Sequence, residues 1–101
     1  MDSEFNKIMQ KVVINITKEY SPQEILLYGS YAKGSNTEDS DIDLAVIFNS
    51  IEDKYFETVS KIFQIVSTID SRIETVLLIK THDKSGFIEH IKNYGITLYK
   101  N

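Results

Sequence analysis

The sequence predicts an α+β fold, a two-layer sandwich in which helices pack on one face of a small mixed β-sheet. Short runs of β-branched and aliphatic residues alternate with longer segments whose apolar residues recur at helical spacing. These segments follow one another in the order α-β-β-α-β-α-β, with few strands. A chain of 101 residues has room for one hydrophobic core, so we expect residues 1–101 to form a single domain.

The first element is a helix whose apolar residues share one face. Asp2 or Ser3 is a plausible N-cap for it. The pair Ser21-Pro22 ends the helix, because a residue before proline disfavours helical backbone. The apolar face consists of Phe5, Ile8, Met9, Val12, Ile16 and Tyr20.

Two strands and the segment between them follow. Residues 25–28 (ILLY) predict a short buried strand that stops at Gly29. Residues 30–40 are rich in Ser, Gly, Asn, Thr and Asp, which predicts a turn and a polar loop. The stretch from Asp41 to Phe48 alternates at first and then becomes apolar, which predicts the second strand.

The second half of the chain contributes two helices and two strands. Ser50 and Asp53 resemble a capping box, which would open a helix with one apolar face extending to Ile69. Residues 72–80 (RIETVLLIK) predict a third strand. A short helix over residues 87–94 and a final strand over residues 96–99 complete the expected order.

Composition narrows the classes of function. Apolar residues make up 42% and charged residues 26% of the chain, which is typical of soluble globular proteins. The absence of cysteine excludes disulfides and cysteine-based zinc sites. Neither a signal peptide nor a membrane-spanning run is evident, so we expect a soluble cytoplasmic protein without membrane contact. A net charge of −4 with dispersed lysines argues against nucleic-acid binding.

Two carboxylates mark the most informative stretch of the sequence. Asp41 and Asp43 stand two residues apart at the start of a predicted strand, so their side chains would project from the same face. Two like charges this close are unfavourable unless a cation neutralises them. Mg²⁺ fits that role, because it prefers oxygen ligands and is often shared between carboxylates and substrate phosphates. A pair of solvated acids is the simpler interpretation of this pattern when it is taken alone.

A glycine-containing turn precedes these carboxylates. Gly29 and Ser30 follow a buried strand directly, where exposed N–H groups and a hydroxyl can bind an anion. Gly34 permits a second tight bend, and Lys33 between them is a possible counter-charge for phosphate or a solvated surface residue. A phosphate cradle beside a metal-binding pair is the combination that metal-assisted phosphoryl or nucleotidyl transfer requires.

The segment GSYAKGSNTEDSDIDL resembles the GSxAxG…SDxDL signature of the DNA polymerase β-like nucleotidyltransferase superfamily, and most of all its minimal nucleotidyltransferases. The resemblance is specific over residues 25–47 and looser beyond them. It implies that Gly29 and Ser30 hold an NTP triphosphate and that Asp41 and Asp43 bind one or two Mg²⁺ ions. It also implies a third carboxylate that completes the metal site and helps to deprotonate the acceptor hydroxyl.

Glu74 is the candidate for that third carboxylate, because it lies near the start of the third predicted strand. Family members often carry aspartate at this place, and a surface acid on an edge strand is the alternative interpretation. Asp70 is a second candidate, although its position also suits a helix end. Tyr31 lies within the motif and can line the nucleotide pocket, whereas Tyr28 and Tyr94 are interpreted as packing residues, as are Tyr20, Tyr55 and Tyr99.

The resemblance implies a transferase that moves NMP, with ATP as the expected NTP, to a hydroxyl acceptor. Minimal nucleotidyltransferases typically pair with a HEPN-domain protein, and some are antitoxins that place AMP on a tyrosine of that toxin. Because the chain has no room for an acceptor domain, the acceptor is expected to be small or to be presented by a partner. The alternatives are a non-catalytic module that binds nucleotide or partner, and transfer to a small molecule such as an aminoglycoside.

Overall fold

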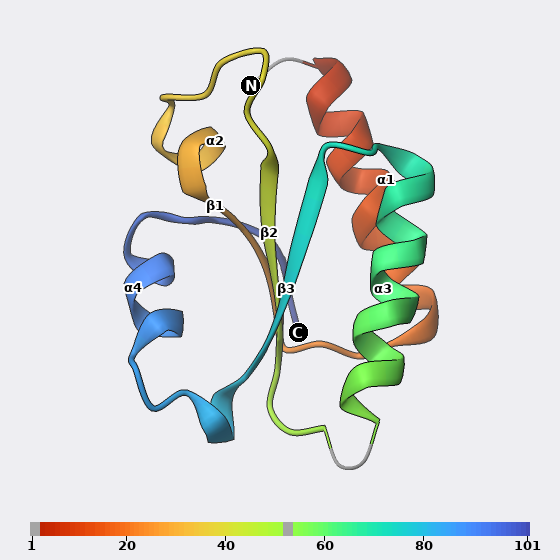
Figure 1. The fold of residues 1–101 in the computed structure, drawn as a ribbon, viewed down its shortest axis with the longest axis vertical. Helices are drawn as coiled ribbons and strands as arrows, with labels where there is room; N and C mark the ends of the chain where they lie inside the picture. The colour runs from red at the N-terminus through yellow and green to blue at the C-terminus, as the bar shows by residue number, and fades with distance from the viewer. Residues whose placement is uncertain (1–2, 52–53) are drawn as a thin grey trace.

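A four-stranded mixed sheet forms the centre of the computed structural model, which describes residues 3–51 and 54–101. The strand order is β3-β2-β1-β4 (Figure 1). β1 pairs antiparallel with both β2 and β4, whereas β3 runs parallel to β2 at one edge. The strands are β1 (Glu24–Tyr28), β2 (Ile42–Phe48), β3 (Ile73–Ile79) and β4 (Ile96–Lys100).

Helices cover both faces of this sheet. The two long helices, α1 and α3, pack on one face, and α4 packs on the other. The short α2 lies at one end of the sheet, with Tyr31 and Ala32 against the cluster under the long helices (Figure 1). The predicted α+β class and mixed sheet are confirmed, but the expectation that all helices share one face is corrected by α4. The helical elements are α1 (Ser3–Glu19), α2 (Gly29–Lys33), α3 (Tyr55–Ile69), the 3₁₀ turn η1 (Lys80–His82) and α4 (Phe87–Tyr94).

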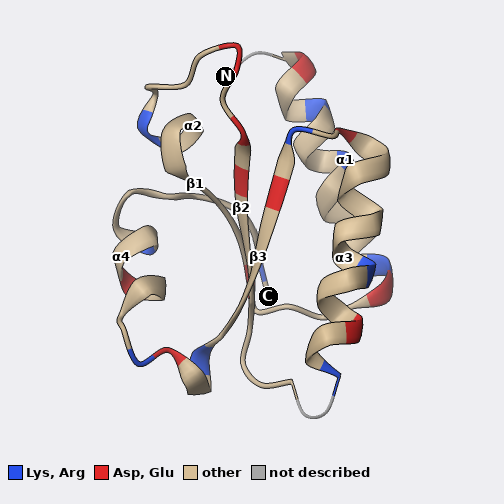
Figure 2. Cartoon of the chain, in the orientation of Figure 1, with Lys and Arg blue, Asp and Glu red and all other residues tan. Residues whose placement is uncertain are grey.

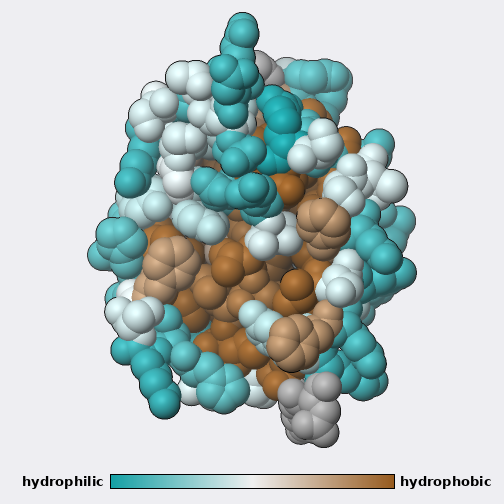
Figure 3. Space-filling view, viewed as in Figure 1, coloured by the Kyte–Doolittle hydropathy of each residue, from teal (hydrophilic) through white to brown (hydrophobic). Residues whose placement is uncertain are grey.

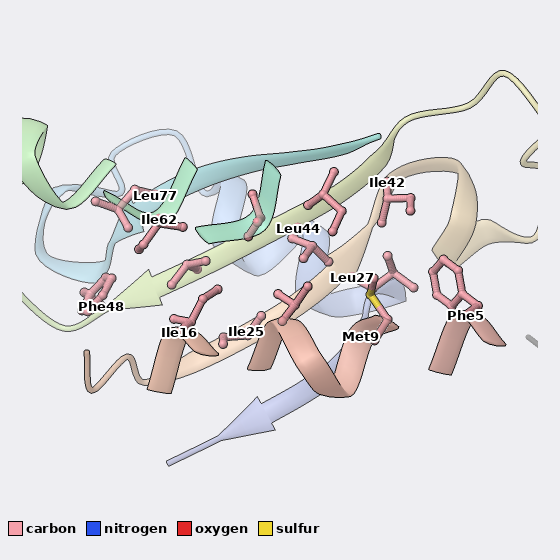
Figure 4. Packing of buried hydrophobic residues seen from close by; sticks show 14 residues of the cluster. Phe5, Met9, Ile16, Ile25, Leu27, Ile42, Leu44, Phe48, Ile62 and Leu77 are labelled. Carbon is pink, nitrogen blue, oxygen red and sulfur yellow. The ribbon is translucent and has the colours of Figure 1, made fainter. Parts of the chain in front are cut away.

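The alternation of side chains along the strands builds two hydrophobic clusters, one on each face. The larger cluster lies between the sheet and the two long helices, where Ile16, Ile25 and Leu44 are fully buried (Figure 4). The smaller cluster lies under α4 and consists of Leu26, Ala45, Ile47, Ile88 and Ile91. Buried residues therefore occur at consecutive positions of β2, and its central part loses the simple alternation of a one-sided strand.

The elements follow the sequence prediction with two omissions, α2 and η1, and one shift, since α3 begins at Tyr55 with Lys54 as its N-cap rather than after Ser50. The helix α2 forms within the segment that we expected to be a turn and loop. The prediction missed this helix of five residues because the segment is rich in polar residues and glycine, which are typical of turns. Gly34 ends it in the left-handed conformation, with a φ of 76°. Two expected capping residues, Asp2 and Asp53, lie outside the described residues. No helix in the described parts of the chain combines the length and apolar character needed to cross a membrane.

Candidate functional site

The three carboxylates singled out in the sequence belong to neighbouring strands at one end of the sheet. Asp41 directly precedes β2, and Asp43 is the second residue of that strand. Glu74 is the second residue of β3 and is the register partner of Asp43 in the parallel pair. Acidic segments accordingly stand side by side on β2 and β3, at the end of the sheet near α2 (Figure 2).

All three carboxylates project to the face of the sheet that α4 covers. Asp41 and Asp43 lie four and two residues before Ala45, so their side chains point to the same face as Ala45, which belongs to the cluster under α4. Glu74 likewise alternates with Val76, which packs against the same cluster. The side chains are partly or largely exposed, so they line a surface site at the margin of this smaller core.

No basic side chain neutralises these acids in the part of the chain that the structure describes, where the salt bridges involve other residues. Burial raises the pKa of the Asp43 carboxyl above its ordinary value, and the nearby Asp41 raises it further. Uncompensated carboxylate oxygens of this kind fit a hard divalent cation. Within residues 3–51 and 54–101, however, no three His, Asp or Glu side chains converge as a metal-binding group.

Gly29 places the backbone directly against the Asp43 carboxylate. Its φ is +70°, in the left-handed region that favours glycine. A Cβ atom added at this position would collide with the Asp43 carboxylate, so both the conformation and the space require glycine. Because Tyr28 is the register partner of Asp43 in the β1–β2 pair, the turn into α2 begins beside the acid.

The other residues of the predicted phosphate cradle lie on α2 or end it. Ser30 is half-buried in the first turn of the helix, and its carbonyl accepts hydrogen bonds from Gly34 N–H and, at 3.0 Å, from Ser35 N–H. Lys33 is exposed at the last position, with its Nζ 4.7 Å from the centroid of the Tyr94 ring. A Cβ atom added at Gly34 would meet nothing within 4 Å. The four predicted residues thus lie on one short helix or end it, and its first residue, Gly29, lies against Asp43.

Two tyrosines join this site, although the sequence analysis interpreted both as packing residues. Tyr94 at the end of α4 accepts a hydrogen bond of 3.2 Å from Gly29 N–H. Burial raises the pKa of the Tyr28 hydroxyl, and Asp43, Tyr94 and Glu74 raise it further, which puts all three near Tyr28. No local pattern could reveal the Tyr94 contact, because it joins residues 65 positions apart.

Two other candidates are engaged elsewhere. Asp70 caps the end of α3 and forms an ion pair of 2.7 Å with Arg72, while also accepting the Arg72 N–H at 2.9 Å. These contacts support its interpretation as a residue at a helix end. Tyr31 stacks on Phe5 of α1 with ring centroids 5.0 Å apart and packs against the core under the long helices. Tyr31 therefore lies on the α1 side of the molecule rather than beside the carboxylates under α4.

A family model described as "Polymerase beta, Nucleotidyltransferase" matches residues 11–101. The curated protein named "Putative protein adenylyltransferase MJ0141" from Methanocaldococcus jannaschii is 27% identical over 96 residues, which cover 92% of this chain and 94% of that protein. The matched region includes the whole candidate site.

Solved structures share the fold. A structure described as a minimal nucleotidyltransferase superposes with a TM-score of 0.69 at 18% identity and covers 95% of both chains. A chain in the structure of a tri-AMPylated Shewanella oneidensis HEPN toxin in complex with MNT antitoxin gives a TM-score of 0.60 at 17% identity, covering 95% of this chain and 73% of that one.

Proposed function

The chain belongs to the polymerase beta nucleotidyltransferase family, and on that premise we propose that it is a protein adenylyltransferase that moves AMP from ATP to a partner protein. The acceptor is a tyrosine hydroxyl of a HEPN toxin, which makes this chain the antitoxin of a two-protein module. The names of similar proteins support this choice. One relative is named as a protein adenylyltransferase, and one structure of the same fold is described as a complex with an AMPylated HEPN toxin. Residues 1–101 act as one minimal nucleotidyltransferase domain.

The observation that carries the proposal is the contact between Gly29 and the Asp43 carboxylate, with Glu74 level with Asp43 on the next strand. A backbone donor, a pair of acids and a further carboxylate then lie at the same end of the sheet. Nucleotidyl transfer needs groups of these types, because the phosphate must be held in line and the acceptor must lose a proton.

Asp41 and Asp43 fit Mg²⁺, because neither is paired with a basic residue in the described chain and Asp41 raises the pKa of Asp43. Mg²⁺ keeps several waters and is usually bound by one or two carboxylates together with substrate phosphates, so a complete protein cage is not required. We assign one or two Mg²⁺ ions to these residues and Glu74. When bound, the metal neutralises charge on the triphosphate.

The chain's own groups bind the nucleotide and move the proton. Gly29 N–H and the Ser30 hydroxyl donate to triphosphate oxygens, and Lys33 supplies positive charge. Gly34 ends α2 directly after Lys33 and so sets the place from which the Lys33 side chain extends. Glu74 accepts the proton of the acceptor hydroxyl, and the hydroxyl oxygen of the acceptor attacks the α-phosphorus. The bond from that phosphorus to the bridging oxygen breaks, and pyrophosphate leaves.

A hydrophobic surface beside the site supports a protein acceptor. It occupies the face where β3 runs between α4 and α3 (Figure 3). On α3, Phe56 is 82% exposed and Phe63 is 58% exposed, at positions seven residues apart on the same helical stripe. A groove of about 390 Å³ lined by Tyr55, Leu78 and Ile88 lies near the far end of β3 from Glu74. Exposed apolar surface of this kind marks interaction sites.

The first experiment compares the wild-type chain with the Asp41→Asn/Asp43→Asn double variant. Each is incubated with Mg²⁺, host lysate and ATP that is radiolabelled at the α-phosphorus. We expect a labelled protein band with wild type only, at the mass of a small helical partner. If the double variant labels the band equally, the carboxylates do not act in transfer and the proposal fails. If no band forms with ATP, the other three NTPs are tested in the same way, and the absence of a band with all four overturns the proposal.

A non-catalytic module that binds nucleotide or partner is the second candidate, because the third carboxylate is a glutamate, Glu74, where family members often carry aspartate. Glu74→Gln separates the two functions with the partner that the first experiment identifies. Under the enzymatic proposal this variant abolishes transfer, with a loss of about 100-fold or more, yet still binds the partner. A partner that is neutralised equally well by Glu74→Gln would instead establish the binding module.

A further inference from the structure

The Tyr94 side chain on α4 contacts two groups of the predicted phosphate cradle, the Gly29 N–H and the Lys33 ammonium. Its hydroxyl oxygen accepts the hydrogen bond from Gly29 N–H at 3.2 Å. Its ring lies under Lys33, whose Nζ is 4.7 Å from the ring centroid. His90 also packs edge-on against this ring, with centroids 5.8 Å apart. One side chain thus engages a backbone donor and an ammonium group that belong to a different helix.

These contacts use the same groups that a triphosphate would use. A backbone N–H has one proton and makes one good hydrogen bond, so Gly29 cannot donate fully to Tyr94 and to a phosphate oxygen. The Lys33 ammonium is attracted to the face of the aromatic ring. It loses at least part of that attraction if it turns toward a phosphate. Tyr94 therefore competes with the nucleotide for both groups.

We propose that Tyr94 is a latch on the nucleotide site, where it lowers the affinity for triphosphate by holding Gly29 N–H and Lys33. The inference rests on the proposed function, since it takes these two groups to be phosphate ligands. It assigns to α4 a part in nucleotide binding that lies outside the GS…DxD segment. The latch opens when the Tyr94 side chain leaves Gly29, and phosphate oxygens then take its place as acceptors.

Calorimetric titration of the full chain with Mg·ATP tests the latch. Tyr94→Phe removes the hydroxyl and keeps the ring, and Tyr94→Leu removes both contacts. Because a neutral hydrogen bond contributes modestly to stability, we expect Tyr94→Phe to bind ATP about 2–10-fold more tightly than wild type. Tyr94→Leu should bind at least as tightly as Tyr94→Phe. Tyr99→Phe on β4, which also loses one hydroxyl, is the matched control and should match wild type.

Equal or weaker binding by Tyr94→Phe overturns the latch, since Tyr94 would then be a bystander or a ligand of the nucleotide. Hydrogen exchange at the Gly29 amide gives a measurement that needs no nucleotide. The exchange rate should rise in Tyr94→Phe but not in Tyr99→Phe, and an unchanged rate also counts against the proposal. If wild type itself binds no Mg·ATP, the proposed function fails, whereas the Gly29 amide still reports whether the Tyr94 contact exists.

Discussion

At the scale of single residues, Gly29 meets two demands at once. Its backbone adopts a φ of +70°, and its missing side chain leaves room for the Asp43 carboxylate. The first demand concerns folding, because L-residues with a side chain pay a steric cost in this region. The second concerns the site, because only a bare backbone allows the carboxylate and the turn to approach so closely. The two demands can be separated by experiment, since Gly34 shares only the first.

Gly29→Ala should therefore destabilise the protein more than Gly34→Ala. Gly34 has a φ of +76° but nothing within 4 Å of an added Cβ, so its substitution costs only the backbone strain of about 1–2 kcal/mol. Gly29→Ala adds the collision with Asp43, and we expect a further loss of at least about 1 kcal/mol. Urea unfolding of both variants measures the difference. Equal losses would mean that Asp43 moves aside freely and that the contact is not a rigid feature of the site.

The sequence predicted the acidic residues of this site better than their surroundings. Asp41 and Asp43 were identifiable because a two-residue spacing on a strand is enough to place side chains on one face. Glu74 could be proposed only as the acid near the next strand, since its register with Asp43 depends on a parallel pairing that no local pattern encodes. Tyr94 could not be predicted at all, because its contact with Gly29 is set by how α4 packs on the sheet.

At the scale of elements, the junction between α3 and β3 is fixed by charge. Asp70 ends the helix, and its carboxylate accepts hydrogen bonds from the Arg72 backbone and guanidinium. The hydrogen bond from the Arg72 side chain holds the pKa of the Asp70 carboxyl below its ordinary value. A lowered pKa means that the ionised carboxylate stabilises the folded chain. That stabilisation is complete above the unfolded pKa, near 3.9, and is lost as the pH falls through the folded pKa.

We expect Asp70→Asn to lower the free energy of unfolding by about 1 kcal/mol at pH 7, because charge-assisted hydrogen bonds exceed neutral ones and Arg72 is partly solvated. The difference from wild type should shrink below about pH 4 and vanish near pH 2. Denaturant unfolding at these pH values measures it. Glu19→Gln is the control, since Glu19 and Lys61 are 3.7 Å apart with both side chains 46% exposed. A difference that persists at low pH would assign the effect to packing rather than charge.

At the scale of the whole molecule, the two faces of the sheet have separate tasks. The face under α1 and α3 carries the larger core and supplies most of the buried apolar surface. The face under α4 carries a smaller core and leaves the carboxylates accessible at its margin. The expectation of helices on one face failed because the fully apolar run of β2 was compatible with burial on one side or both. The class, and the order of the elements apart from α2 and η1, nevertheless followed from periodicity together with the turn and capping residues.

The same arrangement leaves exposed aromatic surface on α3, and this surface is where we expect the protein acceptor to dock. Phe56→Ser and Phe63→Ser should each raise the KM for the labelled partner by about tenfold, as truncation of a central aromatic contact does. Because both side chains are largely exposed, the melting temperature and the affinity for Mg·ATP should stay within error of wild type. Steady-state transfer assays over a range of partner concentrations provide the measurement.

Ile14→Ser provides the matched control, because Ile14 is a large apolar residue that is 53% exposed on α1 rather than α3. It removes comparable apolar surface and should leave the KM for the partner unchanged. If all three variants raise the KM equally, the effect reflects general surface hydrophobicity and not a defined docking face. If only Ile14→Ser raises it, the partner approaches from α1, and the acceptor hydroxyl must then reach Asp43 and Glu74 around the α2 end of the sheet.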